Sequence, residues 1–224
     1  MRYCIKCGAR LPEDLTAQFC PNCGFHVDGQ LPQERTYEPI TAFRREVRIA
    51  SFRTRILVLF VAFVICFAIT ASGAMSVIGA SEAQDLTGQF SNLDQLLNAA
   101  GLEFIFGNNL KHCLIMFVPG AGPFYGGFVL YSTGRVIAAL GATESVNPLG
   151  LLVALFIYPH AWLEYISYSL AISESFWLVF ALVKFGAKGF RNEVSTAAKI
   201  IAVCAVLLLL AAFAEMYIIS LAGA

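Results

Sequence analysis

The sequence predicts an all-α polytopic membrane protein with about five transmembrane helices, some of them broken by Pro or Gly, preceded by a small cysteine-rich module. Hydrophobic residues make up 58% of the 224-residue chain and charged residues only 13%, whereas charged residues approach a quarter of an ordinary soluble domain. Long runs without Lys, Arg, Asp or Glu occur at 56–81 and 112–134. Each run is long enough to cross a hydrocarbon layer about 30 Å thick.

The N-terminal module carries two Cys-x-x-Cys pairs, each followed directly by Gly. Each pair offers two thiolates from one tight turn, and two such turns complete a tetrahedral site for one metal ion. Because we expect no secretory signal, the pairs indicate a metal site in a reducing compartment and not a disulfide framework. We therefore predict a zinc ribbon over 1–27, with iron or a redox dithiol as the alternatives. Its ligands are Cys4, Cys7, Cys20 and Cys23.

The predicted ribbon is too short to fold without its metal, since about 25 residues cannot bury a sufficient core. Its role is therefore structural. Its basic residues are offset by acidic ones, which favours docking of a protein partner over binding of nucleic acid. The charges concerned are Arg2, Lys6 and Arg10 against Glu13, Asp14 and Asp28.

Two further segments lead into the membrane. Residues 28–40 are polar and contain two prolines, which predicts a flexible linker. Residues 41–55 interleave five arginines with apolar residues, which predicts a basic interfacial helix on anionic lipid headgroups, or else a solvated helical lead-in. The remaining residues, 56–224, form the predicted transmembrane helical domain. The arginines before its first span place the N-terminus in the cytoplasm.

The next segment, 82–107, carries four acids and no Lys or Arg, so we expect it outside the membrane. Apolar residues at helical spacing over 93–104 predict an amphipathic helix, resting either on the outer leaflet or on the protein itself. Prolines and glycines crowd the following run, 112–134, and predict a kinked second span with close helix packing or a hinge. We expect this span to end in a cytoplasmic turn over Tyr131–Gly134, before Arg135.

No Lys or Arg occurs between Arg135 and Lys184. If both ends of this segment are cytoplasmic, it crosses the membrane an even number of times, most simply twice. A final span over 200–221 then ends outside. The prediction is a multi-pass protein of the cell membrane with five spans, a cytoplasmic N-terminus and an external C-terminus. Small residues across the middle spans favour homo-oligomers.

Polar residues in this apolar region form the second candidate site. Ionisable groups at bilayer depth usually face a bundle interior or a cavity. His160 and Glu164 are four residues apart and share a helical face. They predict a buried hydrogen bond that locks helices, an ion or ligand site, or a catalytic pair; a catalytic zinc generally needs a third protein ligand. The intramembrane polar site comprises Asn108, Asn109, Glu144, Asn147, His160 and Glu164.

Three segments resemble the stage II sporulation protein M family of integral membrane proteins. They are Phe106-Gly-Asn-Asn-Leu-Lys111, the run GRVIAALG over 134–141, and Tyr158-Pro-His-Ala-Trp-Leu-Glu164, which is similar to that family's Pro-His-Gly-x-x-Glu segment, with Ala161 in place of its usual Gly. The resemblance covers residue 56 to the C-terminus and implies a prokaryotic membrane protein with a scaffold role in membrane complexes. The ribbon lies outside the shared region.

We accordingly predict a non-enzymatic integral membrane scaffold whose cytoplasmic ribbon docks partners. The separate ribbon and the lack of a complete catalytic set favour this function. The alternatives are an intramembrane metal-dependent hydrolase or a small transporter, either of which would use His160 and Glu164.

Overall fold

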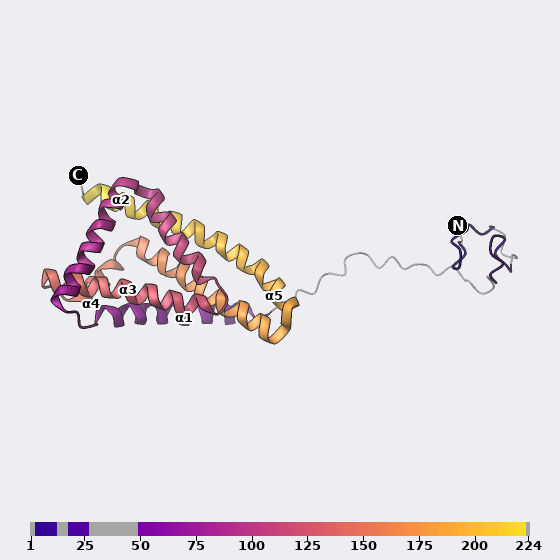
Figure 1. Cartoon of the computed structure of the whole chain (residues 1–224), viewed down its shortest axis with the longest axis horizontal. Helices are drawn as coiled ribbons and strands as arrows, with labels where there is room; N and C mark the ends of the chain where they lie inside the picture. Colours follow the sequence, from indigo (N-terminus) through magenta and orange to yellow (C-terminus); the bar gives the residue numbers. More distant parts are fainter. Residues whose placement is uncertain (1–2, 13–17, 27–48, 223–224) are drawn as a thin grey trace. The chain divides into compact units, whose positions relative to one another are not determined.

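The computed structural model describes residues 3–12, 18–26 and 49–222, which fall into two units, one within Met1–Glu46 and one within Val47–Ala224 (Figure 1). The predicted linker lies outside the described residues, as does most of the predicted interfacial helix. The described part of the chain is mostly helical. Its only extended pairing consists of two isolated bridges in the N-terminal unit, Tyr3 with Arg10 and Phe19 with His26.

Five helical elements make up the second unit: α1 (Phe52–Ala74), α2 (Ala80–Met116), α3 (Ala121–Glu144), α4 (Pro148–Leu155) and α5 (Pro159–Ala222). The first begins where the Ser51 side chain accepts a hydrogen bond from the backbone N–H of Thr54 at 3.2 Å, an N-cap that satisfies one free donor. Arg53 and Arg55 therefore belong to the first turn of α1, and the preceding Ile49 and Ala50 are not helical.

Glycines divide the two longest elements. Gly101 in α2 has φ 58° and ψ −141°, and Gly186 in α5 has φ 64° and ψ −161°. An L-residue with a side chain rarely adopts these angles, so each glycine permits a sharp bend that reverses or redirects the helix. At Gly186 the chain turns back on itself (Figure 1), which makes α5 an antiparallel pair of helices.

The structure corrects two sequence predictions between 112 and 135. The run around Pro119 is not a kinked single span: α2 ends at Met116 and α3 starts at Ala121, because Pro119 supplies no backbone donor and Gly120 has φ 78°. The predicted turn over Tyr131–Gly134 is also wrong, since these residues lie inside α3.

Gly134 lies where α3 packs against α1. The two helices run side by side in the same direction (Figure 1). A Cβ on Gly134 would lie 2.1 Å from the backbone oxygen of Thr70, and a Cβ on Gly73 would lie 2.3 Å from the backbone oxygen of Tyr131. Only glycine allows two helix backbones to approach this closely. The glycine at 134 thus marks a close contact between two helices and not a turn.

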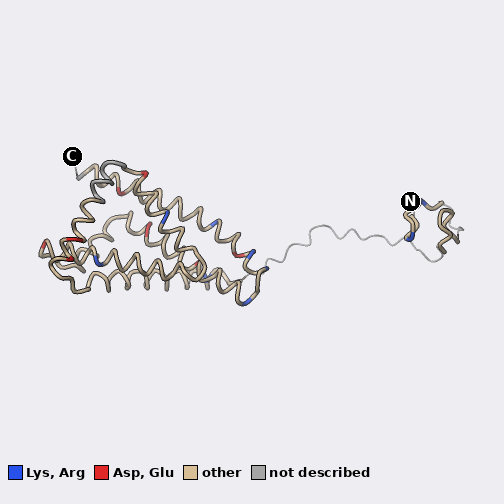
Figure 2. Tube along the Cα trace, in the orientation of Figure 1, with Lys and Arg blue, Asp and Glu red and all other residues tan. Residues whose placement is uncertain are grey.

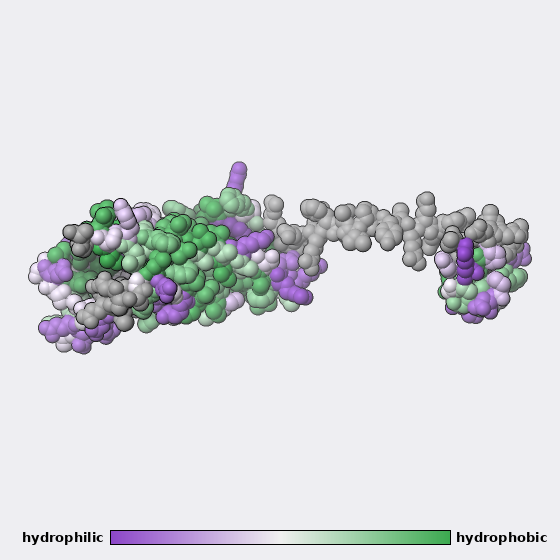
Figure 3. Space-filling model, turned by 90° about the horizontal axis from the view of Figure 1, so that it is seen from above, coloured by the Kyte–Doolittle hydropathy of each residue, from purple (hydrophilic) through white to green (hydrophobic). Residues whose placement is uncertain are grey.

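The helical unit is apolar on its exterior as well as in its core. Buried positions of α1 include Ala62, Cys66, Thr70 and Ala74, a small residue at every fourth position, while Phe60 and Val64 point outward and are 64% and 49% exposed. Figure 3 shows hydrophobic residues over most of the middle of one face, with hydrophilic residues toward both ends. The buried polar side chains include Thr70, Ser167, Ser169, Ser173, Glu174, Ser175 and Glu193.

Within the described residues 49–222, two segments are long and apolar enough to cross a membrane, namely α1 and the 63 residues Pro159–Leu221 of α5. The second is about three times the length that one crossing requires, and Gly186 divides it. The count of about five spans therefore does not follow from these two segments alone.

Charges are distributed unevenly over the helical unit. Figure 2 shows most of its Lys and Arg toward the end where α5 turns back, and most of its Asp and Glu toward the opposite end. At that opposite end the Arg135 guanidinium, on α3, forms an ion pair with Glu82 at the start of α2. The sequence reading had put these two residues on opposite sides of the membrane. They lie together because α3 ends beside the α1–α2 connection.

Candidate metal centre and buried polar clusters

The four N-terminal cysteines converge on one point. Their sulfur atoms all lie within 4.8 Å of one another, with Cys4 and Cys23 3.6 Å apart and Cys7 and Cys20 3.7 Å apart. Four thiolates around a tetrahedral metal at Zn–S distances of about 2.3 Å would be about 3.8 Å apart. The described cysteines are free and form no disulfides. The donor set and its spacing therefore fit a metal ion, whose identity this geometry leaves open.

Backbone turns hold each cysteine pair in place. The N–H of Gly8 donates to the Cys4 carbonyl at 2.8 Å and the N–H of Gly24 donates to the Cys20 carbonyl at 2.9 Å, with φ of 72° and 66° at the two glycines. Hydrogen bonds from the backbone N–H of Ala9 and then from the Asn22 amide lower the pKa of the Cys7 thiol to about 6. This favours the thiolate, the form that binds metals, at Cys7, whereas hydrogen bonding with the Cys7 thiol and burial raise the pKa of Cys23 to about 12.

A second cluster joins α2 to the first half of α5. The Asn109 side-chain amide donates to Glu164 Oε1 at 2.6 Å, and the Tyr168 hydroxyl donates to Asn109 Oδ1 at 3.2 Å. Two of the six predicted polar residues, Asn109 and Glu164, thus lie in contact. Nearby, the Tyr165 hydroxyl donates to Thr70 Oγ1 at 2.8 Å and ties α5 to α1.

His160 takes a different position from the predicted pair with Glu164. Its ring stacks on Tyr158 with centroids 5.8 Å apart, and its buried Nδ1 has no hydrogen-bond partner among the described residues. The Phe156 carbonyl, left free where α4 ends, accepts from Trp162 Nε1 at 2.8 Å. Positions 160 and 164 share one face of the helix, but the His160 ring contacts Tyr158 whereas the Glu164 carboxyl group contacts Asn109.

The other three predicted residues lie elsewhere. Asn108 Oδ1 accepts from Lys111 Nζ at 3.2 Å on the exposed side of α2. Asn147 is the N-cap of α4, where its Oδ1 accepts from the backbone N–H of Leu149 at 2.9 Å. Glu144 is exposed at the end of α3. These three residues therefore occupy a surface contact, a helix cap and a helix end, and none of their described contacts is with Asn109 or Glu164.

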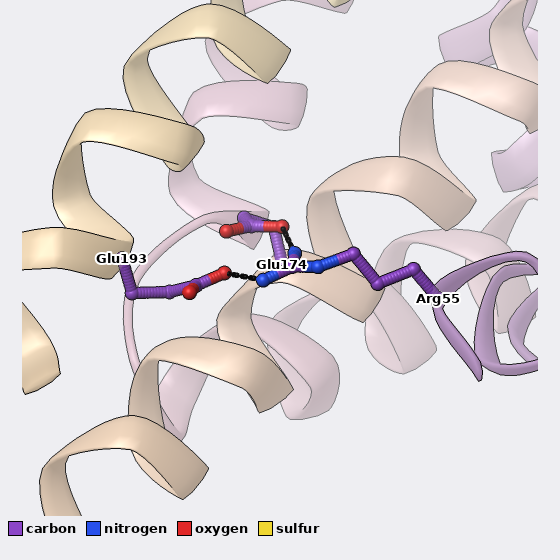
Figure 4. Close-up of polar contacts among 3 residues, drawn as sticks. All are labelled: Arg55, Glu174 and Glu193. Carbon is purple, nitrogen blue, oxygen red and sulfur yellow. Dashed lines mark hydrogen bonds and ion pairs between the residues drawn. The ribbon is translucent and has the colours of Figure 1, made fainter. Parts of the chain in front are cut away.

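A third cluster was missed by sequence reasoning. Arg55 of α1 donates from Nη1 to Glu174 Oε2 at 3.2 Å and from Nη2 to Glu193 Oε1, and so bridges the two halves of α5 (Figure 4). The side chains of Glu174 and Glu193 are each only 2% exposed, against 22% for Arg55. The sequence places Arg55 in a helix on lipid headgroups or in a solvated lead-in, and nothing in the local sequence links it to acids 119 and 138 residues away.

These features define a helical protein with a membrane-type exterior and an N-terminal four-cysteine centre. Comparison with protein families gives a match of residues 56–219 to the family described as Stage II sporulation protein M. The chain belongs to this family, as the three sequence segments indicated, and it is a membrane protein of that family. No curated protein and no solved structure matches the chain.

Proposed function

We propose that this protein is a non-enzymatic, multi-pass membrane scaffold whose N-terminal unit binds zinc and docks partner proteins in the cytoplasm. The observation that carries the proposal is the apolar exterior of the helical unit. Large apolar side chains are exposed along it, among them Phe60, Val64 and Phe213, which suits contact with membrane lipids. Small and hydroxylated residues are buried beside the apolar core, as is typical of helices that pack within a bilayer.

The proposed topology has five crossings. In this proposal α1 crosses outward, the part of α2 after Gly101 returns, α3 crosses outward, and the two halves of α5 cross inward and outward. The short α4 remains at the outer side. This order supports the predicted cytoplasmic N-terminus and external C-terminus, but by a different path, because 135–184 crosses once and 102–144 crosses twice. The basic end, with Arg53, Lys184, Lys188 and Arg191, is then cytoplasmic.

The scaffold function is supported by how the buried polar groups are used. Asn109, Glu164 and Tyr168 hydrogen-bond one another across helices, and Cys113 and Cys204 both donate to the Ser167 carbonyl at 3.8 and 3.6 Å. Groups paired in this way hold helices in register. Among the residues that the structure describes, only the four N-terminal cysteines bring three or more metal-ligating side chains together.

We also propose that the protein can form homo-oligomers, as the sequence predicts. The buried glycines on which that prediction depends contact helices of the same chain, so they do not support it. Gly73, Gly122, Gly126 and Gly134 are buried against the chain's own helices. A second copy would need other surfaces.

We expect Cys20→Ser to abolish both metal binding and partner docking while leaving membrane insertion intact, because one lost thiolate opens the tetrahedral site. The wild-type protein should carry one zinc per chain by elemental analysis, and cross-linking in native membranes should capture partners that the variant does not. Cys204→Ser is the matched control, since Cys204 is buried in the helical unit and its loss should leave the zinc content unchanged.

Two results would contradict the proposal. Capture of the same partners by Cys20→Ser would remove the docking role of the N-terminal unit. Zinc retained after Cys20→Ser but lost after His160→Ala would place the metal in the helical unit and favour the hydrolase alternative.

A further inference from the structure

The contacts of Arg55, Glu174 and Glu193 leave a charge unbalanced inside the helical unit. One guanidinium faces two carboxyl groups, and it gives each of them a single N–H instead of pairing fully with either. With both acids ionised the cluster would carry one net negative charge. A buried charge without a partner costs several kcal/mol, so such groups are normally paired or neutralised.

The cluster also contains polar atoms that lack partners. Glu174 is 1% exposed, and its Oε1 receives no hydrogen bond from any residue that the structure describes. Figure 4 shows the two carboxyl groups converging on one guanidinium, Glu174 from the first half of α5 and Glu193 from the second. Two carboxylates that face one guanidinium repel each other, whereas a carboxylic acid can donate its proton to a neighbouring carboxylate.

A metal cation is the less suitable ligand for this position. The Arg55 guanidinium already contacts both acids and would repel a second cation a few ångströms away. The Trp177 ring lies 5.3 Å from Arg55 Cζ and covers that side of the guanidinium. A proton needs no coordination shell and neutralises the excess charge within one hydrogen bond.

We propose that Glu174 and Glu193 form a binding site for one exchangeable proton, which the two carboxyl groups share beside Arg55. The proton comes from the aqueous phase at the basic end of the unit and returns there, and no covalent bond other than the O–H bond forms or breaks. Arg55, with its side chain 22% exposed, lies on the boundary between the site and water.

The groups that surround the site come from three directions. From α1 the charged group is Arg55, from the first half of α5 it is Glu174, and from the second half it is Glu193. The α2–α3 turn packs nearby through the Val118 carbonyl, which accepts from Ser175 Oγ at 2.7 Å, and presents no charged side chain among its described contacts. Other cations of this end, Lys184, Lys188 and Arg191, are exposed.

Binding of the proton would control how strongly α1 is held against the two halves of α5. With the proton bound, one acid and Arg55 form a neutral pair, and the second acid is a hydrogen-bond donor. When the proton leaves, two carboxylates compete for one guanidinium across the Gly186 turn. Because the folded protein holds a proton that the unfolded chain releases at neutral pH, the stabilisation is lost as pH rises into the alkaline range.

Infrared spectroscopy of the full-length protein in lipid nanodiscs tests this proposal. The carbonyl band of protonated carboxylic acids should lose one equivalent per chain in Glu174→Gln, and the same equivalent in Glu193→Gln, because the proton is shared. Glu82→Gln is the matched control: its carboxylate pairs with an arginine at the exposed end, and the band should be unchanged. Gln mimics the protonated acid, so both variants should lose the alkaline decline in thermal stability.

An unchanged band in both variants would overturn the proposal. So would a stabilisation of the wild-type protein by sodium or calcium ions that Glu174→Gln abolishes, since the ligand would then be a metal cation. Should either variant fail to fold, the wild-type protein alone decides. A flat profile of stability between neutral and alkaline pH would contradict proton binding, and a decline that tracks loss of one acid equivalent would support it.

Discussion

Replacing Arg55 by Ala should destabilise the helical unit by about 3–5 kcal/mol, the usual loss when one partner of a buried ion pair is removed. Glu174 and Glu193 would keep their buried positions but lose the cation that both contact. Unfolding in mixed micelles by increasing denaturing detergent, followed by circular dichroism, measures this loss. Adding Glu193→Gln to Arg55→Ala should recover part of it, because a single acid, which one proton neutralises, then remains in the buried cluster.

The matched control for Arg55→Ala is Arg135→Ala. Arg135 also pairs with a glutamate, but the side chains of Arg135 and Glu82 are 28% and 48% exposed. Exposed pairs contribute about 0–1 kcal/mol, so this variant should unfold close to the wild type. Equal losses for the two arginine variants would contradict the assignment of Arg55 to a buried cluster that holds α1 against α5.

Replacing Gly134 by Leu should cost about 3 kcal/mol or more, at or beyond the upper end of the usual range for overpacking. The atom that a side chain at 134 would meet is the backbone oxygen of Thr70, at 2.1 Å from the new Cβ. Backbone cannot rotate aside as a side chain can, so α1 and α3 must separate. The same unfolding assay measures the loss, and reduced yield of folded protein from membranes should accompany it.

Gly88→Ala is the control for this substitution. Gly88 lies within α2 and a Cβ there meets no atom within 4 Å. Alanine stabilises an exposed helix interior by roughly 0.5–1 kcal/mol relative to glycine. A destabilisation of similar size in both variants would show that the loss at 134 does not come from contact with α1.

Sequence reasoning succeeded where chemistry is local. The spacing of the four cysteines was sufficient to predict that they converge, because each Cys-x-x-Cys-Gly turn is set by its own backbone hydrogen bonds. The resemblance in the 158–164 segment led to the family that the match over 56–219 shows. The end of α4 before Pro159 also follows from the chemistry of proline.

It failed where residues distant in sequence determine the outcome. The sequence predicts a turn over Tyr131–Gly134, before Arg135, but the partners of Gly134 and Arg135 are Thr70 and Glu82 on other helices. The sequence also places Arg55 in a helix on lipid headgroups or in a solvated lead-in, whereas its partners lie on α5. A sequence pattern gives the face of a helix, and it does not give which other helix covers that face.

The proposed order of membrane crossings can be tested with reporter fusions. Alkaline phosphatase, active only outside the cytoplasm, and a fluorescent protein, bright only inside, should be fused to the full chain at the C-terminus and inserted at the turns around Gly120, Val146 and Gly186. Five crossings in this order should give active phosphatase at Val146 and at the C-terminus, and fluorescence at Gly120 and Gly186. Fluorescence at Val146, or the same response at Gly120 and Val146, would contradict the five-crossing arrangement.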